Sequence, residues 1–576
     1  MDFMDRYRKW LSDPCIDEDT KAELRLMAGE EKEIKERFYQ ELEFGTGGLR
    51  GIIGTGSNRM NFYTVGKATQ GLANYIKKQG TQAKGVAISY DSRHMSPEFA
   101  KTAGLVLAAN GIPAFVYPSL RPTPMLSFAV RRLRCTAGIM VTASHNPPEY
   151  NGYKVYWADG AQVVAPRDQD IIREVNGVTE YGQILRITQE EAEERGLYHT
   201  IGKEIDRCFD EQVLSQRICP EISEDMGEDL TVIYTPIHGS GNVPVRRVLH
   251  KAKYKKVFVV SEQENPDPDF TTVGYPNPED PNVFTLAKKL SEEKNADIII
   301  GTDPDCDRLG AMVKNAQGEY VVLTGNMVGV LLTEYILSHK AEKGTLPHDG
   351  AVIKTIVSTE MIQPICDHYG ITKFEVLTGF KFIGEKMKEF EETGAYQYLF
   401  GFEESYGYLA GTYARDKDAV VAALLLCEMA AVYKKKGMSL YDGLQKLYEK
   451  FGYYLDGVKA ITLKGLDGIE RIQKIMSAFR QNVPKAFAGQ KVVWAKDYKT
   501  QVFRNLQTGE EAASPLPVSD VLYYILEDST WVCVRPSGTE PKLKFYIGVK
   551  GESLADAQGK LEEIEKDLEQ KVSSVK

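Results

Sequence analysis

Short apolar runs that alternate with helical segments are the feature that most restricts the fold of this chain. Runs such as GVAISY at 85–90, GIMVTA at 138–143 and ADIIIG at 296–301 are each followed at once by polar residues. Helical patterns such as PEFAKTAGLVLAANG separate them, which is typical of parallel strands joined by crossover helices. The sequence therefore predicts an α/β fold.

Several domains are expected, because the 576 residues exceed the size at which a single core keeps growing. The β-α alternation occurs in three successive stretches, whereas the C-terminal part has short strands (VLYYIL, WVCVRP, KLKFYIGV) and a closing helix. The first forty residues are predicted to be amphipathic helix. The predicted domains are three α/β units at 1–205, 206–320 and 321–455 and a smaller α+β domain at 456–576.

Composition excludes several classes of protein. With 43% hydrophobic and 26% charged residues the chain is globular, and its net charge of -10 argues against a nucleic-acid binder. The 8 cysteines form no C-x-x-C pair, which argues against a zinc site and favours a reducing compartment. The N-terminus resembles no signal peptide, and the longest apolar run, at 419–427, is too short to span a bilayer and is predicted to be a buried helix. We expect a cytoplasmic protein.

We expect functional residues in the loops that follow strands, because open α/β sheets bind ligands there. In TASHNP, Ser144 directly follows a strand and could be exposed and rigidly aimed, with His145 beside it. The alternative is an ordinary Ser-Asn-Pro turn. No G-x-S-x-G motif surrounds this serine, so the sequence does not support the nucleophile elbow of an α/β-hydrolase. Lys154, in NGYK, could bring a positive charge back to the same place, or lie on the surface.

A second loop, GTDPDCDR, carries Asp303, Asp305 and Asp307 at a spacing of two. In an extended loop this spacing turns the three carboxylates to one side, where they would repel each other without a cation, and hard oxygen ligands suit Mg2+. An EF-hand is set aside because Arg308 and Lys314 occupy its glycine and glutamate positions. The alternative is a solvated acidic loop.

Two further loops contain groups suited to a phosphorylated sugar. In GFEES, Glu403 and Ser405 could hold sugar hydroxyls, although an acidic turn is equally ordinary. The loop RPSGTEPK could form a phosphate cradle or a hairpin turn with solvated charges; its groups are Arg535, Ser537, Gly538 and Thr539. No P-loop motif occurs. Together the four loops predict phosphoryl transfer through a serine on a phosphorylated polyhydroxy compound.

At these residues the sequence resembles the α-D-phosphohexomutase family. TASHNP, GTDPDCDR, GFEES and RPSGTEPK resemble that family's phosphoserine, metal, sugar and phosphate loops, in the same order and over nearly the whole chain. The resemblance implies an α/β protein of four domains around a central cleft: three related mixed α/β units and a smaller C-terminal α+β domain, which we expect to be mobile.

The resemblance also implies roles for individual residues. Ser144 would be phosphorylated and, through its phosphoryl oxygen, would share the Mg2+ site with Asp303, Asp305 and Asp307. The basic residues around the reacting groups, any of which could move the substrate proton, would be Arg50, His145, Lys154 and Lys381. The substrate-binding residues would be Arg308, Thr378, Gly379, Glu403, Ser405, Arg535, Ser537, Gly538 and Thr539.

The implied reaction converts a hexose 1-phosphate into the 6-phosphate through a 1,6-bisphosphate, with Mg2+ and priming glucose 1,6-bisphosphate as the cofactors. GFEESYGY lacks the histidine of the G-E-x-S-G-H loop found in many family members. Together with FGTGGLRG and TGFKF it resembles the longer-chain branch of α-phosphoglucomutases, phosphopentomutases and sugar-bisphosphate synthases. Glucose is the expected sugar, with ribose or mannose as alternatives. A Mg2+-dependent sugar phosphatase and a sugar-phosphate-binding pseudoenzyme are alternatives from other classes. We expect a monomer or homodimer.

Overall fold

The computed structural model describes residues 2–45, 48–462, 465–537 and 542–575. The chain forms two compact units. Unit 1 comprises the chain up to Leu323 together with Phe380–Tyr398 and Ser405–Ser439. Unit 2 comprises Thr324–Gly379, Leu399–Glu404 and the chain from Leu440 onward.

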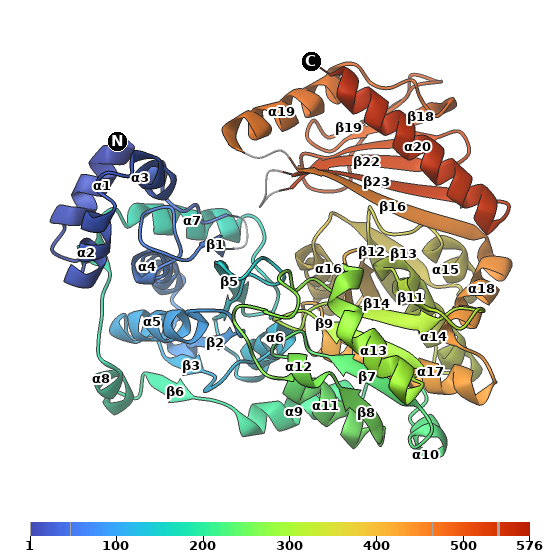
Figure 1. Ribbon diagram of the computed structural model, residues 1–576, viewed down its shortest axis with the longest axis horizontal. Coiled ribbons are helices and arrows are strands. Elements are labelled where there is room, and N and C mark those ends of the chain that lie inside the picture. Colours follow the sequence, from blue (N-terminus) through green and yellow to red (C-terminus); the bar gives the residue numbers. More distant parts are fainter. Residues whose placement is uncertain (1, 46–47, 463–464, 538–541, 576) are drawn as a thin grey trace. The chain divides into compact units, whose positions relative to one another are not determined.

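The first sheet of unit 1 has the strand order β1-β5-β4-β2-β3-β6. Its parallel strands are β2 (Val86–Tyr90), β3 (Ala114–Val116), β4 (Ala137–Val141) and β6 (Tyr198–Thr200). At one edge β5 (Tyr150–Trp157) runs antiparallel to β4 and to β1 (Gly48–Ile52). Helices α4 (Phe62–Lys78), α5 (Ser96–Ala109) and α6 (Thr123–Arg132) connect these strands (Figure 1). The expected parallel strands are confirmed, and β4 ends just before the TASHNP loop.

The N-terminal segment is helical, as predicted, but it is divided among α1 (Phe3–Ser12), α2 (Glu18–Leu26) and α3 (Glu31–Phe38). Pro14 follows α1, and Asp17 caps α2 by accepting a hydrogen bond from the backbone N–H of Thr20. The rings of Trp10 and Phe38 meet edge to face, 5.6 Å apart. These helices form a small core of their own.

The second sheet of unit 1 has the strand order β11-β10-β9-β7-β8. Parallel strands β7 (Thr231–Thr235), β8 (Lys256–Val259) and β9 (Ile298–Thr302) form its centre, and β10 (Leu309–Lys314) and β11 (Tyr320–Leu323) continue it in antiparallel fashion. Helices α11 (Asn242–Lys251), α13 (Thr285–Lys294) and α17 (Ala419–Lys435) pack against this domain. The apolar run at 419–427 is part of the buried helix α17, as predicted. Strand β9 ends immediately before the GTDPDCDR loop.

Within its described residues, unit 1 also contains six further α-helices and one further strand. They are α7 (Arg167–Gly177), α8 (Gln189–Glu194), α9 (Lys203–Leu214), α10 (Ile222–Met226), α12 (Ser261–Glu264), α16 (Phe380–Thr393) and β15 (Gly407–Ala410).

Unit 2 contains a parallel pair, β12 (Gly350–Thr355) and β13 (Thr372–Val376), with β14 (Gln397–Glu403) on the other side of β12. Helices α14 (Gly325–Glu342) and α15 (Ile362–Tyr369) pack together, and α18 (Leu440–Phe451) packs against α14. Both Thr378 and Glu403, which the sequence predicts to bind substrate, follow or end strands of this sheet.

The C-terminal sheet, also in unit 2, is antiparallel, with the order β16-β23-β22-β21-β18-β19-β20. Its strands are β16 (Tyr453–Thr462), β17 (Ala486–Phe487, paired with β18), β18 (Gln490–Asp497), β19 (Val502–Asn505), β20 (Glu511–Ala513), β21 (Leu522–Leu526), β22 (Trp531–Pro536) and β23 (Lys542–Gly551). Helix α20 (Leu554–Ser574) lies along β16 and β23 (Figure 1), and α19 (Gly465–Gln481) joins the same core. The predicted α+β domain is confirmed, as are the three mixed α/β domains before it.

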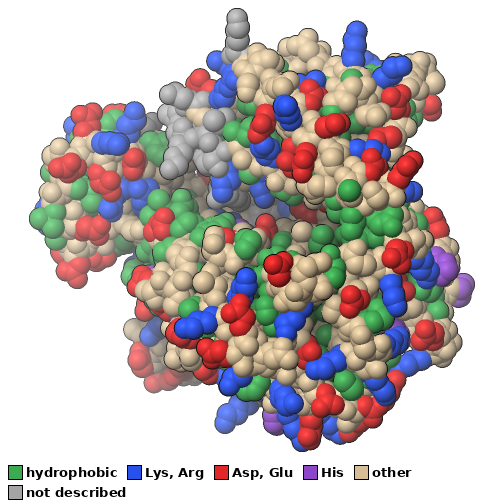
Figure 2. Space-filling view, turned by 45° about the vertical axis from the view of Figure 1, so that its right-hand side comes forward, with side chains coloured by type: hydrophobic (Ala, Val, Ile, Leu, Met, Phe, Trp, Pro, Cys, Tyr) green, Lys and Arg blue, Asp and Glu red, His purple; other side chains and the backbone are tan. Residues whose placement is uncertain are grey.

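The surface carries both charges. On the face shown in Figure 2, acidic and basic side chains are interspersed. Among the described residues, no helix combines the length and the apolar character that a membrane span requires.

Candidate active site

Ser144 lies three residues beyond the end of β4, in a strained and buried turn. Its φ of 52° is in the left-handed region, which non-glycine residues seldom adopt. Its backbone N–H donates to Oγ1 of Thr142 at 2.8 Å. Its hydroxyl donates to Oδ2 of Asp303 at 2.9 Å, and Nδ1 of His145 lies 3.2 Å from the same hydroxyl oxygen. The serine is therefore directed at the predicted metal loop, but it is buried, so the expectation that it is exposed is wrong.

Arg93, which the sequence reasoning missed, holds this turn in place. Its guanidinium donates to the carbonyl oxygens of Ser144 at 2.6 Å, Pro147 at 2.8 Å and Tyr150 at 3.0 Å, and also to that of Asn146. The residue is 2% exposed. Because a guanidinium offers five donors in a fixed plane, it can fix the path of a whole loop.

A buried carboxylate completes the support. Asp91 accepts hydrogen bonds from the backbone N–H of Arg93 at 3.0 Å and from the Thr142 hydroxyl at 2.5 Å. Burial raises the pKa of Asp91, although the Arg93 guanidinium opposes this. A hydrogen-bonded path thus runs from Asp91 through Thr142 to the backbone of Ser144.

The predicted acidic cluster is present. Asp303, Asp305 and Asp307 are all buried, and one carboxylate oxygen of each lies within 4.8 Å of the others. Oδ1 of Asp303 accepts hydrogen bonds from the backbone N–H groups of Asp307 at 3.0 Å and Arg308 at 2.9 Å, so the loop curls around this side chain. The expected convergence of the three carboxylates is confirmed.

Two carboxylate oxygens of this cluster, Oδ1 of Asp305 and Oδ1 of Asp307, are buried and have no hydrogen-bond partner among the described residues. Buried polar atoms without a hydrogen-bond partner are rare in folded proteins and destabilise them. Burial and the neighbouring carboxylates raise the pKa of Asp303; burial would also raise that of Asp305, but the Lys154 ammonium brings it below its usual range. Hard, unpartnered oxygens in a group of three acids fit a divalent cation.

Two lysines lie against the carboxylates. Nζ of Lys154 is 2.9 Å from Oδ2 of Asp305 and 3.8 Å from Oδ2 of Asp307, while Nζ of Lys417 is 3.1 Å from the latter oxygen. The structure thus places Lys154 in the site, as expected. Lys417 was not predicted, because it lies on a loop more than a hundred residues away in sequence, and the only signal was its charged neighbourhood, ARDKD.

The other predicted basic residues occupy different positions. Arg50, on β1, reaches Oδ1 of Asn146 at 3.4 Å and so borders the serine turn. Nη1 of Arg308 is paired with Glu279 at 2.8 Å. Lys381, at the start of α16, faces a cavity of about 210 Å³ that Trp157 and Arg167 also line. Burial lowers the pKa of Lys381, and the charges of Asp168 and Glu385 offset part of this effect.

Ser405 belongs to unit 1, and the other described residues of the predicted sugar and phosphate loops belong to unit 2. Glu403 is 3% exposed at the end of β14. Oε2 of the adjacent Glu404 accepts a hydrogen bond from the Thr355 hydroxyl at 2.8 Å; burial and the charge of Glu403 raise the pKa of Glu404 to about 6, and Arg535 opposes this.

The Thr378 hydroxyl is buried without a hydrogen-bond partner among the described residues, which is rare in folded proteins. Gly379 beside it has a φ of 117° and open space where a Cβ would be. The backbone N–H of Ser537 donates to the carbonyl of Lys542 at 2.7 Å. Gly538 and Thr539 lie outside the described residues.

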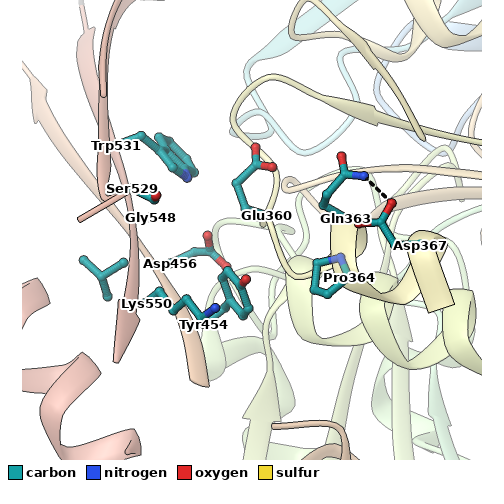
Figure 3. A pocket seen from close by; sticks show the side chains of 11 residues that line it. Glu360, Gln363, Pro364, Asp367, Tyr454, Asp456, Ser529, Trp531, Gly548 and Lys550 are labelled. Carbon is teal, nitrogen blue, oxygen red and sulfur yellow. Dashed lines mark hydrogen bonds between the residues drawn. The ribbon is translucent and has the colours of Figure 1, made fainter. Parts of the chain in front are cut away.

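A cavity of about 370 Å³ in unit 2 is lined by none of the predicted site residues that the structure describes. Carboxylates of Glu360, Asp367 and Asp456 and the Trp531 ring surround it (Figure 3). The carboxylate of Asp367 accepts a hydrogen bond from Gln363 at 2.8 Å. This cavity is therefore distinct from the serine and aspartate cluster.

Comparison with known proteins gives consistent matches along the chain. Models of phosphoglucomutase/phosphomannomutase α/β/α domains I, II and III match residues 41–182, 211–318 and 324–451, and the model of the C-terminal domain matches 469–565. A phosphoglucomutase of Staphylococcus haemolyticus (strain JCSC1435) is 35% identical over 89% of this chain and 91% of its own. A phosphoglucomutase of Staphylococcus aureus (strain MSSA476) is 36% identical over 92% of this chain and 93% of its own. The solved structure of the phosphoglucomutase parafusin from Paramecium, in an open form, has a TM-score of 0.67 at 18% identity and covers 92% of this chain and 95% of that one.

Proposed function

The chain belongs to the phosphoglucomutase/phosphomannomutase family, and we propose that it interconverts α-D-glucose 1-phosphate and glucose 6-phosphate through a phosphorylated Ser144. Relatives at 35% and 36% identity over about nine tenths of the chain are phosphoglucomutases, which supports the choice of sugar. The observation that carries the proposal is the Ser144 hydroxyl, held 2.9 Å from Oδ2 of Asp303, in a cluster where Oδ1 of Asp305 and Oδ1 of Asp307 have no hydrogen-bond partner among the described residues.

The serine would act as a carrier of the phosphoryl group. In the first step a hydroxyl oxygen of the sugar phosphate bonds to phosphorus, the bond from phosphorus to Ser144 Oγ breaks, and the hydroxyl proton passes to a base of the protein. The bisphosphate formed then returns its other phosphoryl group to Ser144 Oγ, which leaves the isomeric monophosphate. Glucose 1,6-bisphosphate would therefore also prime an unphosphorylated enzyme.

Asp303, Asp305 and Asp307, with an oxygen of the Ser144 phosphoryl group, would hold Mg2+, which supplies positive charge against the charge that develops on the transferred group. The protein adds Lys154 and Lys417, whose ammonium groups lie at the carboxylates. We propose that one of Arg50, His145, Lys154 and Lys381 receives the proton.

Substrate binding would draw on groups from several loops. The Thr378 hydroxyl, which has no hydrogen-bond partner in the described part of the chain, and the open space at Gly379 suit a ligand contact. Glu403 and Ser405 would hold sugar hydroxyls, and Arg535, Ser537, Gly538 and Thr539 would hold the non-reacting phosphate, with Arg308 beside the reacting one. The domain limits at 205, 320 and 455, the cytoplasmic location and the monomeric or dimeric state stay predictions.

The test is kcat/KM for glucose 1-phosphate, mannose 1-phosphate and ribose 1-phosphate, with Mg2+ and a trace of the matching bisphosphate, because this ratio compares the binding of transition states. We expect glucose 1-phosphate to be preferred by at least about tenfold. A preference for ribose would make the enzyme a phosphopentomutase. Release of inorganic phosphate as the main product would make it a phosphatase, and substrate binding without turnover would make it a pseudoenzyme.

A further inference from the structure

The segment at 266–279, between α12 and the next helical turn, contacts four residues at or beside the reacting groups. It pairs Asp269 with His94, Phe270 with Arg93, Tyr275 with His145 and Glu279 with Arg308. We infer that this segment is a positioning element: Phe270 and Tyr275 fix the serine turn against the metal loop through Arg93 and His145. The inference rests on the proposed phosphoryl transfer at Ser144.

The contact with Arg93 controls the path of the serine turn. The Phe270 ring is fully buried, and its centroid lies 5.0 Å from Cζ of Arg93. An aromatic face at this distance attracts a guanidinium and restricts the plane in which it lies. Since the same guanidinium donates to the carbonyl of Ser144, a tilt of its plane would be passed to the serine backbone.

The contact with His145 controls the side chain next to the nucleophile. The rings of Tyr275 and His145 meet edge to face, with centroids 6.0 Å apart and planes at 81°. Nδ1 of the same imidazole lies 3.2 Å from the Ser144 hydroxyl oxygen. The tyrosine ring therefore limits the rotation of a group that borders the reacting atom.

The segment is itself tied to the metal loop by the turn that follows β7. His238 in this turn lies 2.8 Å from the Thr272 hydroxyl through Nε2 and 3.0 Å from the Asn265 carbonyl through Nδ1. Two residues further on, Ser240 donates to the Pro304 carbonyl through both its backbone N–H, at 2.8 Å, and its hydroxyl, at 2.9 Å.

The backbone approach between this turn and the metal loop is close, because a Cβ on Gly239 would lie 2.6 Å from Cα of Pro304. One turn thus holds the metal loop on one side and the 266–279 segment on the other. The segment in turn reaches Arg93 and His145, so it sets the distance between Ser144 and Asp303.

Tyr275 offers the cleaner test, because it is only partly buried and its replacement leaves the core intact. We would compare Tyr275→Leu, which removes the ring, with Tyr275→Phe, which keeps it. The measured quantity is the single-turnover rate of label transfer from glucose 1,6-bisphosphate to the full-length protein with Mg2+, together with KM for glucose 1-phosphate.

We expect Tyr275→Leu to slow labelling roughly threefold to tenfold, the change in rate that the loss of one aromatic pair would cause. KM for glucose 1-phosphate should stay unchanged. Tyr275→Phe should label at the wild-type rate. Wild-type labelling by Tyr275→Leu, or equal slowing by both variants, would overturn the role of the ring. A wild-type protein that takes no label at Ser144 would overturn the proposed function and the inference with it.

A second comparison separates positioning from stability at Phe270. Phe270→Leu is matched with Phe209→Leu, a fully buried ring in α9 that packs against Phe128 and Tyr413. Both variants should lower the unfolding midpoint to a similar degree, but only Phe270→Leu should slow labelling below the midpoint. Equal labelling rates in the two variants would contradict the inference.

Discussion

The hydroxyl of Ser144 donates a 2.9 Å hydrogen bond to Oδ2 of Asp303, a residue 159 positions later in the sequence. The two residues follow β4 and β9, which belong to different sheets of unit 1. Asp303 directly follows β9 and Ser144 lies three residues beyond β4, so both are at the carboxyl ends of parallel strands, the place where α/β sheets bind ligands. The bond therefore joins two such sheet ends at the proposed reaction centre.

Replacing Ser144 by alanine removes the atom that would carry the phosphoryl group. We expect Ser144→Ala to take no label from glucose 1,6-bisphosphate and to lose mutase activity, because Ser144 supplies the hydroxyl that is bonded to Asp303. Mass spectrometry of the labelled protein would locate the phosphate. The exposed Ser215→Ala is the control and should label normally; wild-type labelling of Ser144→Ala would place the nucleophile elsewhere.

Replacing Asp305 by asparagine leaves the size of the side chain unchanged but removes one negative charge from the cluster. We expect the Mg2+ concentration for half-maximal activity to rise at least roughly tenfold, since even neighbours of metal ligands have effects of this size. Asp297→Asn, at the N-terminal end of β9 and paired with Lys434, serves as the matched control. An unchanged Mg2+ requirement in Asp305→Asn would show that the metal binds at another place.

Replacing Arg93 by lysine keeps the charge but removes the planar set of donors. An ammonium cannot reach carbonyls as widely spread as those of Ser144 and Tyr150 in one geometry. We expect activity to fall by about 100-fold from misplacement of the serine. The conservative Arg132→Lys, at the exposed end of α6, should have no effect on kcat. Full activity in Arg93→Lys would mean that the turn holds its shape without this residue.

The buried carboxyl of Asp418 at the start of α17 predicts a pH dependence of stability. Burial raises its pKa from 3.8 to about 6, although Tyr413 and the backbone N–H of Val420 donate to it. The folded protein thus holds this proton more tightly than the unfolded chain. The resulting stabilisation is fully present below about pH 4 and is lost as the pH rises through 6.

The matching measurement compares the unfolding of the wild type with that of Asp418→Asn between pH 4 and pH 7. The stability advantage of the wild type should shrink by roughly 3 kcal/mol over this range, since each pKa unit is worth about 1.4 kcal/mol. Parallel pH profiles for the two proteins would show that Asp418 does not titrate differently on folding.

The positions of Ser144 and of the three aspartates at strand ends could be predicted from the sequence, because each group follows an apolar run; their roles come from the family resemblance and stay predictions. A spacing of two after an apolar strand is enough to bring Asp303, Asp305 and Asp307 together, and Ser144 follows its strand in the same way. Arg93 could not be predicted, because its role depends on carbonyls more than fifty residues away, which carry no side-chain signal. Lys417 likewise reaches Asp307 only through tertiary folding.

Other differences between the sequence-based expectations and the structure also have a physical cause. The N-terminal helical pattern is correct in type but interrupted, since Pro14 lacks the N–H that a continuing helix needs. The 266–279 segment, rich in proline and acidic residues, has no periodic pattern, so only its contacts with Arg93 and His145 reveal its importance.

Lys154 and Lys417 give the aspartate cluster counter-charges of its own. A divalent cation that enters the cluster would therefore displace two ammonium groups. Its binding free energy would be the difference between its own contacts with the carboxylates and the lysine contacts that it replaces. Such an exchange would make release of the cation easier, because the two lysines would pair with the carboxylates again. It would also leave two displaced ammonium groups beside the cluster at the moment when an anionic sugar phosphate arrives.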